Sequence, residues 1–543
     1  MDATMMHEPL GTPMIVEHGE RIHATSRIGF FDGEDIAWRS YEQTARRARQ
    51  LASALKSIGV GTNTRVATLS WNDFAHFEAY LAVPAMGAVL HTLNLRLHPE
   101  QLSFIMADAG DTVLIADADL LADVASEIDA LDKLSHVIVT GDISKLAGLK
   151  AECIAYEDFI ASCPPLAAFP VPEELSAAAT CYTSGTTGDP KGVVYSHRTI
   201  ALHSLGSMGA NSFALSDRDR ILLLPPMFHA NAWGLPYSGW LAGADFVLPG
   251  SHLGPDMIRK MIRLCAPTFT ATVPTILNDL LRADETDPLD MSSFRTIVAG
   301  GSAVSQGLIA EVENRWHVPL IQGWGMTETS PVCVLSHPAA DATGDEAHRL
   351  QAKSGRPVAG VRVRLVDDDG APVAEDGKSV GRLQLKGIWI ARGYHRGVGA
   401  DVLTEDGWLD TGDAGTIDER GYVQVTDRLK DLIKSGGEWI PSAELENHIS
   451  GLPGVHLAAV IGIADERWEE RPLAIVTSKS GEVPDFGSLR SALRDEVARF
   501  WIPEYWSHRT DLPLTGVGKI DKQALRRQVS AGDLQFQRVD DFA

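Results

Sequence analysis

The chain has 543 residues, of which 44% are hydrophobic and 22% charged, and its 72 acidic and 48 basic residues give a formal net charge of −24. A chain of this length is too long for a single core, so we expect two or more domains. The acidic balance argues against a nucleic-acid binder with a general basic face and against adhesion to anionic membranes. It does not exclude small anionic ligands, because a cleft can be locally positive on an acidic protein.

Neither the cysteines nor the first residues indicate export. The five cysteines show no Cys-x-x-Cys spacing and no density typical of a disulfide framework, which favours a reduced, cytoplasmic setting. The first 20 residues carry four acidic side chains and lack the apolar core of a signal peptide. The longest apolar run, 79–90, has 12 residues and contains Pro84. It is too short to span a bilayer, so we expect a core segment there.

Short apolar runs alternate with helical patterns along the first half of the chain. Ser40 followed by Gln43 predicts a capping box, and an apolar stripe at helical spacing continues until Gly59. Strands of the buried parallel type are predicted at 65–69, 113–116 and 137–139. This alternation predicts open α/β layers with helices on both faces.

The pattern changes twice in the second half. Beyond Gly355, short alternating segments separated by Asp/Gly turns predict a β-rich subdomain with strands at 361–366 and 382–385. After Asp427, a charged joint precedes a compact α+β segment. Its predicted elements are strands at 455–463 and 473–476 and a helix striped by Leu489, Leu493 and Val497. We therefore expect a large domain at 1–427, a hinge at 428–432 and a small domain at 433–543.

The stretch 183–192, Thr-Ser-Gly-Thr-Thr-Gly-Asp-Pro-Lys-Gly, lies between two predicted strands. Its glycines, hydroxyl groups and lysine form a loop that can turn backbone N–H groups inward and hold phosphate oxygens. A flexible surface turn is the ordinary alternative. A Walker A loop is excluded, because Pro190 precedes Lys191 and Gly192 follows it. The stretch therefore predicts a phosphate-binding loop of another kind.

Residues 182–192 resemble the signature of the adenylate-forming enzymes, which include acyl-CoA synthetases, firefly luciferase and the adenylation domains of peptide synthetases. Further motifs of this family follow in the expected order. The resemblance implies an α/β fold: a large N-terminal domain of layered α/β subdomains plus a β-rich subdomain, with a small mobile α+β C-terminal domain that acts as a lid.

The resemblance also implies a reaction in two halves. A carboxylate attacks the α-phosphorus of ATP to give acyl-AMP and pyrophosphate, and the thiol of coenzyme A then attacks the acyl carbonyl. Both transition states concentrate negative charge on oxygen, so fixed cations, Mg²⁺ and oriented donors are expected.

Nucleotide contacts are implied by the phosphate loop and by the motif 323–328, Gly-Trp-Gly-Met-Thr-Glu. An indole between glycines can lie flat against a base, and a nearby carboxylate suits Mg²⁺. A buried tryptophan in a tight turn is the plain alternative. The implied nucleotide contacts are Thr183, Ser184, Gly185, Thr187, Gly188, Lys191, Gly301, Gly323, Trp324, Gly325, Thr327, Asp413 and Arg428; Thr186 and Glu328 are implied for both catalysis and Mg²⁺. Asp413 and Arg428 would hold the ribose, because a carboxylate accepts from both hydroxyls of a diol.

The resemblance implies that the acid binds near residues 226–234, Pro-Met-Phe-His-Ala-Asn-Ala-Trp-Gly. The sequence of this segment is most similar to that of fatty-acyl-CoA synthetases. His229 would lie near the acyl carboxylate, with a catalytic role, although a core histidine is the commoner outcome for such a residue. Trp233 would separate the acyl tunnel from the nucleotide. Gly300 would bring backbone close to the adenylate, since glycine is needed where a ligand touches the main chain.

Three further positions lie in the predicted hinge and small domain. Lys430 matches the hinge residue of the family, and a solvated linker lysine is its alternative. A segment with two glycines resembles the loop that serves the thioester step; its residues are Lys434, Gly436, Gly437, Glu438 and Trp439. A plain Gly-Gly hairpin is the alternative. Lys519, in Gly-Val-Gly-Lys-Ile, matches the catalytic lysine of adenylation. The family shows Arg or Lys soon after this Ile, whereas here Asp521 comes before Lys522.

The predicted protein is an ATP-dependent acyl-CoA synthetase that uses ATP, Mg²⁺ and coenzyme A on a medium- or long-chain fatty acid. The alternatives are a ligase for a short, methylthio-alkanoic or aryl acid and a free-standing ligase that loads a carrier protein. Oxygenation of the luciferase kind and a nucleotide sensor without catalysis are further alternatives. A cytoplasmic homodimer is expected, with no nucleic acid and at most peripheral membrane contact.

Overall fold

The computed structural model describes residues 1, 3–146, 149–183, 189–398, 402–435, 438–465, 467–478, 480–514 and 520–539. The chain forms two compact units: Met1–Arg362 with Lys386–Leu409, and Val363–Leu385 with Asp410–Ala543. This division groups 363–385 and 410–427 with the C-terminal segment, whereas the sequence prediction keeps them in the large domain. The predicted boundary at Asp427 stays a prediction.

The first unit contains a seven-stranded sheet in the order β7-β6-β5-β3-β4-β8-β9. Neighbouring strands are parallel except for β8 and β9, which pair antiparallel on either side of the predicted phosphate loop. The strands are β3 Arg65–Leu69, β4 Val89–Thr92, β5 Val113–Asp117, β6 His136–Thr140, β7 Glu152–Ala155, β8 Ala177–Thr183 and β9 Lys191–Ser196. The central residues of β3, β4, β5, β6 and β8 are buried, as expected for parallel strands covered on both faces, whereas those of the edge strand β7 are only partly buried.

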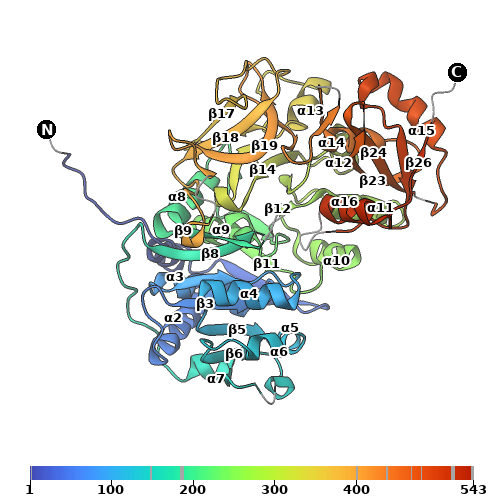
Figure 1. Cartoon of the computed structure of the whole chain (residues 1–543). Coiled ribbons are helices and arrows are strands. Elements are labelled where there is room, and N and C mark those ends of the chain that lie inside the picture. Colours follow the sequence, from blue (N-terminus) through green and yellow to red (C-terminus); the bar gives the residue numbers. More distant parts are fainter. Residues whose placement is uncertain are drawn as a thin grey trace. The chain divides into compact units, whose positions relative to one another are not determined.

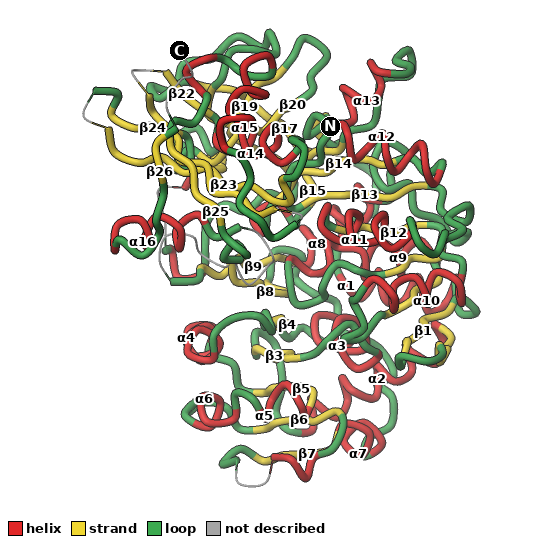
Figure 2. Tube along the Cα trace, turned by 90° about the vertical axis from the view of Figure 1, so that its right-hand side faces the viewer, coloured by secondary structure: helices red, strands yellow, loops and turns green. Residues whose placement is uncertain are grey.

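Helices cover both faces of this sheet, α4 and α6 on one side and α2 and α7 on the other (Figure 2). The helices of the first unit are α1 Thr12–Ile22, α2 Tyr41–Ser57, α3 Phe74–Ala85, α4 Pro99–Ala109, α5 Ala118–Ala122, α6 Ala125–Asp129, α7 Tyr156–Ala161, α8 His197–Ser207, α9 Leu235–Ala242, α10 Pro255–Cys265, α11 Pro274–Asp284, α12 Gln306–Trp316 and α13 Asp345–Gln351. The predicted capping box forms at the start of α2, where Ser40 and Gln43 bond each other's backbone N–H. The apolar run 79–90 is buried in α3 and β4.

A nine-stranded sheet completes the first unit, in the order β16-β15-β14-β13-β12-β10-β11-β1-β2. Figure 1 labels its strands β11, β12 and β14. Its central strands are parallel, and the pairs at both ends are antiparallel. The strands are β1 Arg27–Phe31, β2 Ile36–Ser40, β10 Arg220–Leu222, β11 Asp245–Leu248, β12 Phe269–Thr272, β13 Thr296–Gly300, β14 Leu320–Gly325, β15 Val332–Leu335 and β16 Arg356–Pro357. In open α/β sheets ligands bind beyond the carboxyl ends of the strands. Gly300 and Gly323–Gly325 lie at those ends in β13 and β14.

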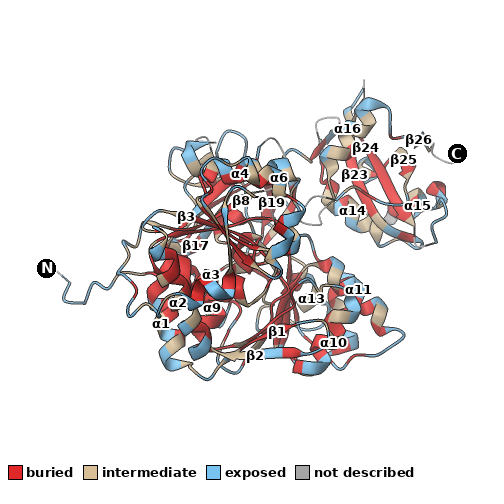
Figure 3. Ribbon diagram, turned by 90° about the horizontal axis from the view of Figure 1, so that it is seen from below, coloured by how far each residue is buried: buried red, intermediate tan, exposed pale blue. Residues whose placement is uncertain are grey.

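The second unit contains two further sheets. The first has the order β17-β18-β19-β20 and the second the order β22-β21-β24-β25-β26, with β23 paired to β24. The strands are β17 Val361–Val366, β18 Gly381–Gly387, β19 Leu409–Ile417, β20 Val423–Arg428, β21 Ile433–Ser435, β22 Glu438–Ile440, β23 Val455–Asp465, β24 Glu469–Ser478, β25 Tyr505–His508 and β26 Gln537–Arg538, and the helices are α14 Ser442–Ser450, α15 Phe486–Ala492 and α16 Lys522–Ala531. The central residues of β23 and β24 are buried (Figure 3).

One predicted element is shorter than expected. The helix striped by Leu489, Leu493 and Val497 ends at Ala492, and a 3₁₀ turn, 493–495, follows it. Leu493 is nevertheless fully buried, and Val497 packs against the same core. The apolar stripe indicated which residues face the core. A 3₁₀ turn can direct these residues to the core as a turn of α-helix does. None of the described helices is long and apolar enough to cross a membrane.

Candidate active site

The predicted phosphate loop connects strands β8 and β9, which pair antiparallel. Thr183 and Lys191 are directly opposed at the end of this antiparallel ladder. Five residues that are predicted to contact nucleotide or Mg²⁺ lie outside the described residues: Ser184, Gly185, Thr186, Thr187 and Gly188. The structure therefore places the lysine at the mouth of the loop, where its charge can meet phosphate oxygens.

Lys191 and Glu328 meet at a residue that sequence reasoning missed, Tyr394. The hydroxyl of Tyr394 donates to Glu328 Oε1 at 2.5 Å, and Lys191 Nζ lies 5.3 Å from the centre of the Tyr394 ring. A cation over an aromatic face and a hydroxyl on a carboxylate are both favourable contacts. Tyr394 follows Gly393 in a segment without a distinctive spacing, so no local signal marks it.

Glu328 is suited to hold Mg²⁺. It is only 6% exposed, and among the described residues no hydrogen bond occupies its second carboxylate oxygen. Mg²⁺ prefers oxygen ligands and usually takes one or two carboxylates together with substrate phosphates and water. The chemistry of this side chain therefore fits the predicted ion, while its predicted partner Thr186 lies outside the described residues.

The motif that is predicted to hold adenine forms a tight strand end. Gly323, Trp324 and Gly325 close β14, and a methyl group at Gly325 would lie 1.9 Å from the carbonyl oxygen of Pro331. The backbone carbonyl of Thr327 accepts from the buried Tyr195 hydroxyl at 2.7 Å. Trp324 is partly exposed.

Trp233 lies in a left-handed turn. Ala230, Asn231, Ala232 and Trp233 have φ of 43°, 51°, 49° and 58°, and Gly234 follows with φ 74°. Each non-glycine residue costs roughly 1–2 kcal/mol in this conformation, so the surrounding packing must hold the turn. Such strain clusters at functional sites.

The turn brings Trp233 to Gly300. A methyl group at Gly300 would lie 2.8 Å from the carbonyl oxygen of Gly323 and 3.2 Å from the tip of the Trp233 ring. A side chain at Gly300 would therefore collide with the backbone of β14 and crowd the Trp233 ring. Gly301 follows with φ 83°, in the left-handed region that favours glycine. His229 precedes the turn and is partly buried; its backbone N–H donates to Pro226.

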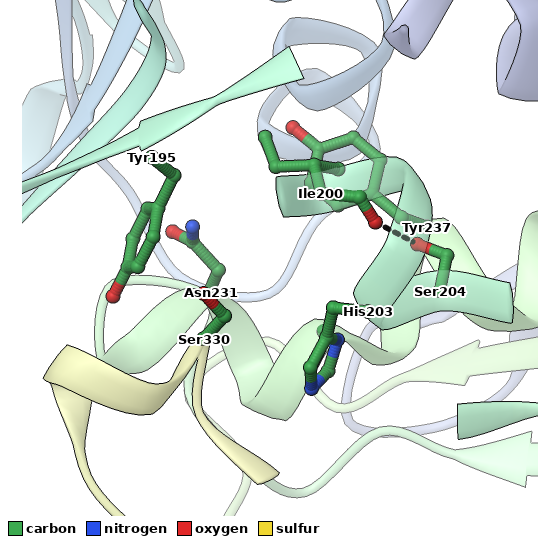
Figure 4. A pocket seen from close by; sticks show the side chains of 8 residues that line it. Tyr195, Ile200, His203, Ser204, Asn231, Tyr237 and Ser330 are labelled. Carbon is green, nitrogen blue, oxygen red and sulfur yellow. Dashed lines mark hydrogen bonds between the residues drawn. The ribbon is translucent and has the colours of Figure 1, made fainter. Parts of the chain in front are cut away.

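A cavity of about 10 Å³, close to the room for one water molecule, adjoins the turn (Figure 4). Its lining residues are Tyr195, Ile200, His203, Ser204, Asn231, Gly234, Tyr237 and Ser330. Burial lowers the pKa of His203 to about 3, so this imidazole is neutral. His203 Nε2 accepts from the backbone N–H of Val332, which leaves the proton on Nδ1, beside Ser207. The ring lies against Gly234, where a methyl group would meet it at 2.5 Å.

In the second unit the structure brings the two predicted ribose contacts together. Asp413 and Arg428 are opposed in the β19–β20 ladder, and Arg428 Nε lies 2.8 Å from Asp413 Oδ1. The Asp413 side chain is 3% exposed and that of Arg428 43%. Lys430 follows, and burial lowers its pKa below the ordinary lysine value.

The predicted thioester loop is flanked by paired strands. Lys434 lies opposite Trp439 in the β21–β22 ladder, so a paired strand flanks the two glycines on each side along the chain. Lys434 forms an exposed ion pair with Glu469 at 3.2 Å, and Trp439 is 46% exposed. Gly436, Gly437, the side chain of Glu438 and Lys519 lie outside the described residues.

Comparison with known proteins identifies the family. The AMP-binding enzyme model matches residues 17–395, and the model of the AMP-binding enzyme C-terminal domain matches 444–519. The chain is 41% identical over 534 residues to a long-chain-fatty-acid–CoA ligase of Thermus thermophilus, covering 97% of both chains. It is 38% identical to a medium-chain-fatty-acid–CoA ligase of Ectopseudomonas oleovorans, covering 96% of this chain and 97% of the relative.

Two further relatives differ in the acid they use. The chain is 38% identical to a 3-methylmercaptopropionyl-CoA ligase of Ruegeria pomeroyi, covering 96% of this chain and 98% of the relative. The crystal structure of an anthranilate CoA ligase in complex with anthranoyl-AMP superposes with a TM-score of 0.87 at 25% identity, covering 98% of this chain and all of that one. The predicted fold, large α/β layers with a small α+β C-terminal domain, is confirmed. The chain therefore belongs to the AMP-binding enzymes and, within them, to the acyl-CoA synthetase branch, which confirms the predicted reaction class of AMP-forming acid–thiol ligation.

Proposed function

We propose that the protein is a fatty-acyl-CoA synthetase for medium- or long-chain acids. The observation that carries this proposal is the near full-length similarity to two fatty-acid–CoA ligases. The placement of the Trp233 ring against Gly300 supports it, because an indole at a sheet edge offers an apolar wall to an acyl chain. A shorter, sulfur-containing acid is the second candidate, favoured by the similarity to the 3-methylmercaptopropionyl-CoA ligase.

In the proposed mechanism, residues of the chain bind ATP and stabilise the charge that develops on phosphate. Thr183 and Lys191, with residues 184–188, hold phosphate oxygens, and Trp324, between Gly323 and Gly325, lies against adenine. Asp413 accepts from both ribose hydroxyls, and Arg428 fixes that carboxylate at 2.8 Å. Thr327 and Gly301 complete the nucleotide contacts.

The acid and the two half-reactions involve further residues. His229 lies beside the acyl carboxylate, with Trp233 and Gly300 in the acyl pocket. Lys519 stabilises the α-phosphate and the attacking carboxylate during adenylation. The segment 434–439, with its two glycines, admits the pantetheine thiol for the second half.

We also propose that Glu328, with Thr186, holds Mg²⁺, which would neutralise charge on the phosphate oxygens when bound. The 433–543 domain is proposed to turn about Lys430 in the hinge 428–432, relative to the domain 1–427. A cytoplasmic homodimer with free coenzyme A as the acceptor is part of the same proposal, and loading of a carrier protein is the alternative acceptor reaction.

A screen of acids from two to eighteen carbons tests the substrate class. Each methylene in an apolar tunnel should contribute about 0.8 kcal/mol, near fourfold in binding, until the pocket ends. We expect kcat/KM for thioester formation to climb with chain length and then to fall, and Trp233→Ala to shift the preferred length. A maximum at a three- to five-carbon methylthio acid would favour the second candidate. Pyrophosphate release without thioester formation, restored by a carrier protein, would identify the alternative acceptor.

A further inference from the structure

Two loops of the second unit are predicted to serve the two half-reactions, and each begins and ends in described residues. Residues 515–519 carry Lys519, and 436–437 are the glycines of the thioester loop. The ends of the first are tied by a β-bridge between Leu514 and Ile520 and by the N–H of Asp521, which donates to Pro513 at 2.8 Å. The ends of the second are tied by the pairing of Ser435 with Glu438.

A buried lysine anchors the first loop. Lys522, the first residue of α16, places Nζ 2.8 Å from Glu446 Oε1 and donates to Ser442 Oγ at 2.6 Å. Its side chain is 12% exposed and that of Glu446 15%. The backbone N–H of Val460 also donates to Glu446, at 2.7 Å. Lys522 thus fixes the start of α16, three residues after Lys519, to helix α14 and strand β23.

The same network reaches the predicted hinge. Asp427, the residue before Arg428, accepts from the backbone N–H and the hydroxyl of Ser442, both at 2.5 Å. Burial alone would lower the pKa of Lys522, but the carboxylates of Glu446 and Asp427 outweigh it and hold the pKa above its ordinary value. The lysine therefore keeps its charge at neutral pH, and the anchor remains closed.

A buried arginine anchors the second loop. Arg471, on β24, donates through Nη1 to Ser435 Oγ and to the carbonyl of Phe500, both at 2.9 Å, and its Nη2 lies 3.1 Å from Glu504 Oε1. Its side chain is 7% exposed. Ser435 is the last residue of β21, directly before Gly436. The guanidinium therefore fixes the position from which the glycines start.

We propose that Lys522 and Arg471 are positioning residues, each of which holds the base of one loop and so serves one half-reaction. Lys522 supports adenylation, and Arg471 supports thioester formation. The inference rests on the proposed function and extends it to residues outside the predicted site. It also accounts for the departure noted in the sequence, because the cation two positions after Ile520 is a buried anchor.

The test measures the two half-reactions separately in the full-length protein. Adenylation is followed as pyrophosphate release from ATP and dodecanoic acid, and thioester formation as dodecanoyl-CoA made from supplied dodecanoyl-AMP and coenzyme A. Lys522→Met should slow adenylation by about 100-fold, the effect expected of a misplacement near 1 Å, and leave thioester formation within about twofold. Arg471→Met should do the reverse. Arg527→Met, which removes an exposed cation from the same helix α16, should change neither.

Second variants separate positioning from folding. Lys522→Met combined with Glu446→Gln removes both charges, so no unpaired carboxylate of this pair stays buried. Adenylation should remain slow in this double variant although its thermal midpoint recovers; recovered adenylation would overturn the positioning role. Arg471→Lys keeps the charge but loses the planar fork, so thioester formation should remain impaired.

The results distinguish failure of the two positioning roles from failure of the proposed function. If both single variants lost both half-reactions equally, or lost neither, the positioning roles of Lys522 and Arg471 would be wrong. The proposed function would be unaffected. A wild-type protein that performed neither half-reaction with any acid from two to eighteen carbons would overturn the proposed function and the anchors with it.

Discussion

The two compact units hold their predicted site residues by different forces. In the first unit, uncharged groups in close contact do most of this: the Trp233 ring lies against Gly300, and the neutral His203 ring lies against Gly234. In the second unit, charges do it: Arg428 pairs with Asp413, and Lys522 with Glu446. The first arrangement should respond to changes in side-chain size, and the second to changes in charge and to salt.

The largest expected effect is steric. Gly234→Ala should lower the free energy of unfolding by about 2–4 kcal/mol, because φ is 74° and the methyl group would meet the His203 ring at 2.5 Å. Denaturant unfolding of the variant measures this loss. Gly61→Ala is the matched control, since nothing lies within 4 Å of the added methyl group. Equal midpoints for the two variants would remove the steric half of the comparison.

Tyr394→Phe tests a contact with a charged group in the first unit, the hydrogen bond from Tyr394 to the Glu328 carboxylate. The variant loses a hydrogen bond to the Glu328 carboxylate. The gain in ATP affinity that Mg²⁺ provides should therefore fall by about 1.5–3 kcal/mol, roughly ten- to a hundredfold. Calorimetric titration of ATP at several Mg²⁺ concentrations measures this shift. Tyr195→Phe, which loses a bond to the neutral Thr327 carbonyl, should leave the Mg²⁺ dependence unchanged. The same response in both variants would separate Tyr394 from the proposed Mg²⁺ site.

Arg428→Met should lower the free energy of unfolding by about 1–2 kcal/mol. This is less than the roughly 3–5 kcal/mol of a fully buried pair, because the arginine side chain is 43% exposed. The difference from wild type should shrink in 1 M salt, where exposed charges are screened, whereas that of Gly234→Ala should not. Thermal unfolding at low and high salt checks this, and identical salt behaviour of both variants would contradict the charge-based half of the comparison.

The smallest effect concerns pH. The pKa of His203 is about 3 in the folded chain and near 6.5 when unfolded, so between these values only the unfolded state binds the proton. Stability from the neutral imidazole is therefore lost as pH falls below 6.5. His203→Gln should reduce the loss of unfolding free energy between pH 6.5 and 5.5 by about 1 kcal/mol. Urea unfolding at pH 6.5 and at pH 5.5 measures this change. The variant should keep part of the pH dependence of the unfolding free energy, because His76 and His197 each have a pKa of about 4.

Much of the local structure follows from the sequence. The capping box at Ser40 and Gln43, strand β3 at 65–69 and strand β17 at 361–366 are determined by turn chemistry and apolar periodicity within a few residues. The signature around Lys191 likewise identified the family, because its residues are contiguous. The end of α15 was not determined in this way, since a 3₁₀ turn also places Leu493 in the core.

The sequence by itself determined the family, the reaction class and the residues that carry recognisable motifs. Only the tertiary structure decided which distant residues support them. Tyr394 reaches Glu328 across 66 positions, and Lys522 reaches Ser442 across 80. The reason is physical: a motif is a local pattern of side chains, whereas such contacts depend on how strands and helices pack. Neither periodicity nor spacing along the chain encodes a partner at that distance.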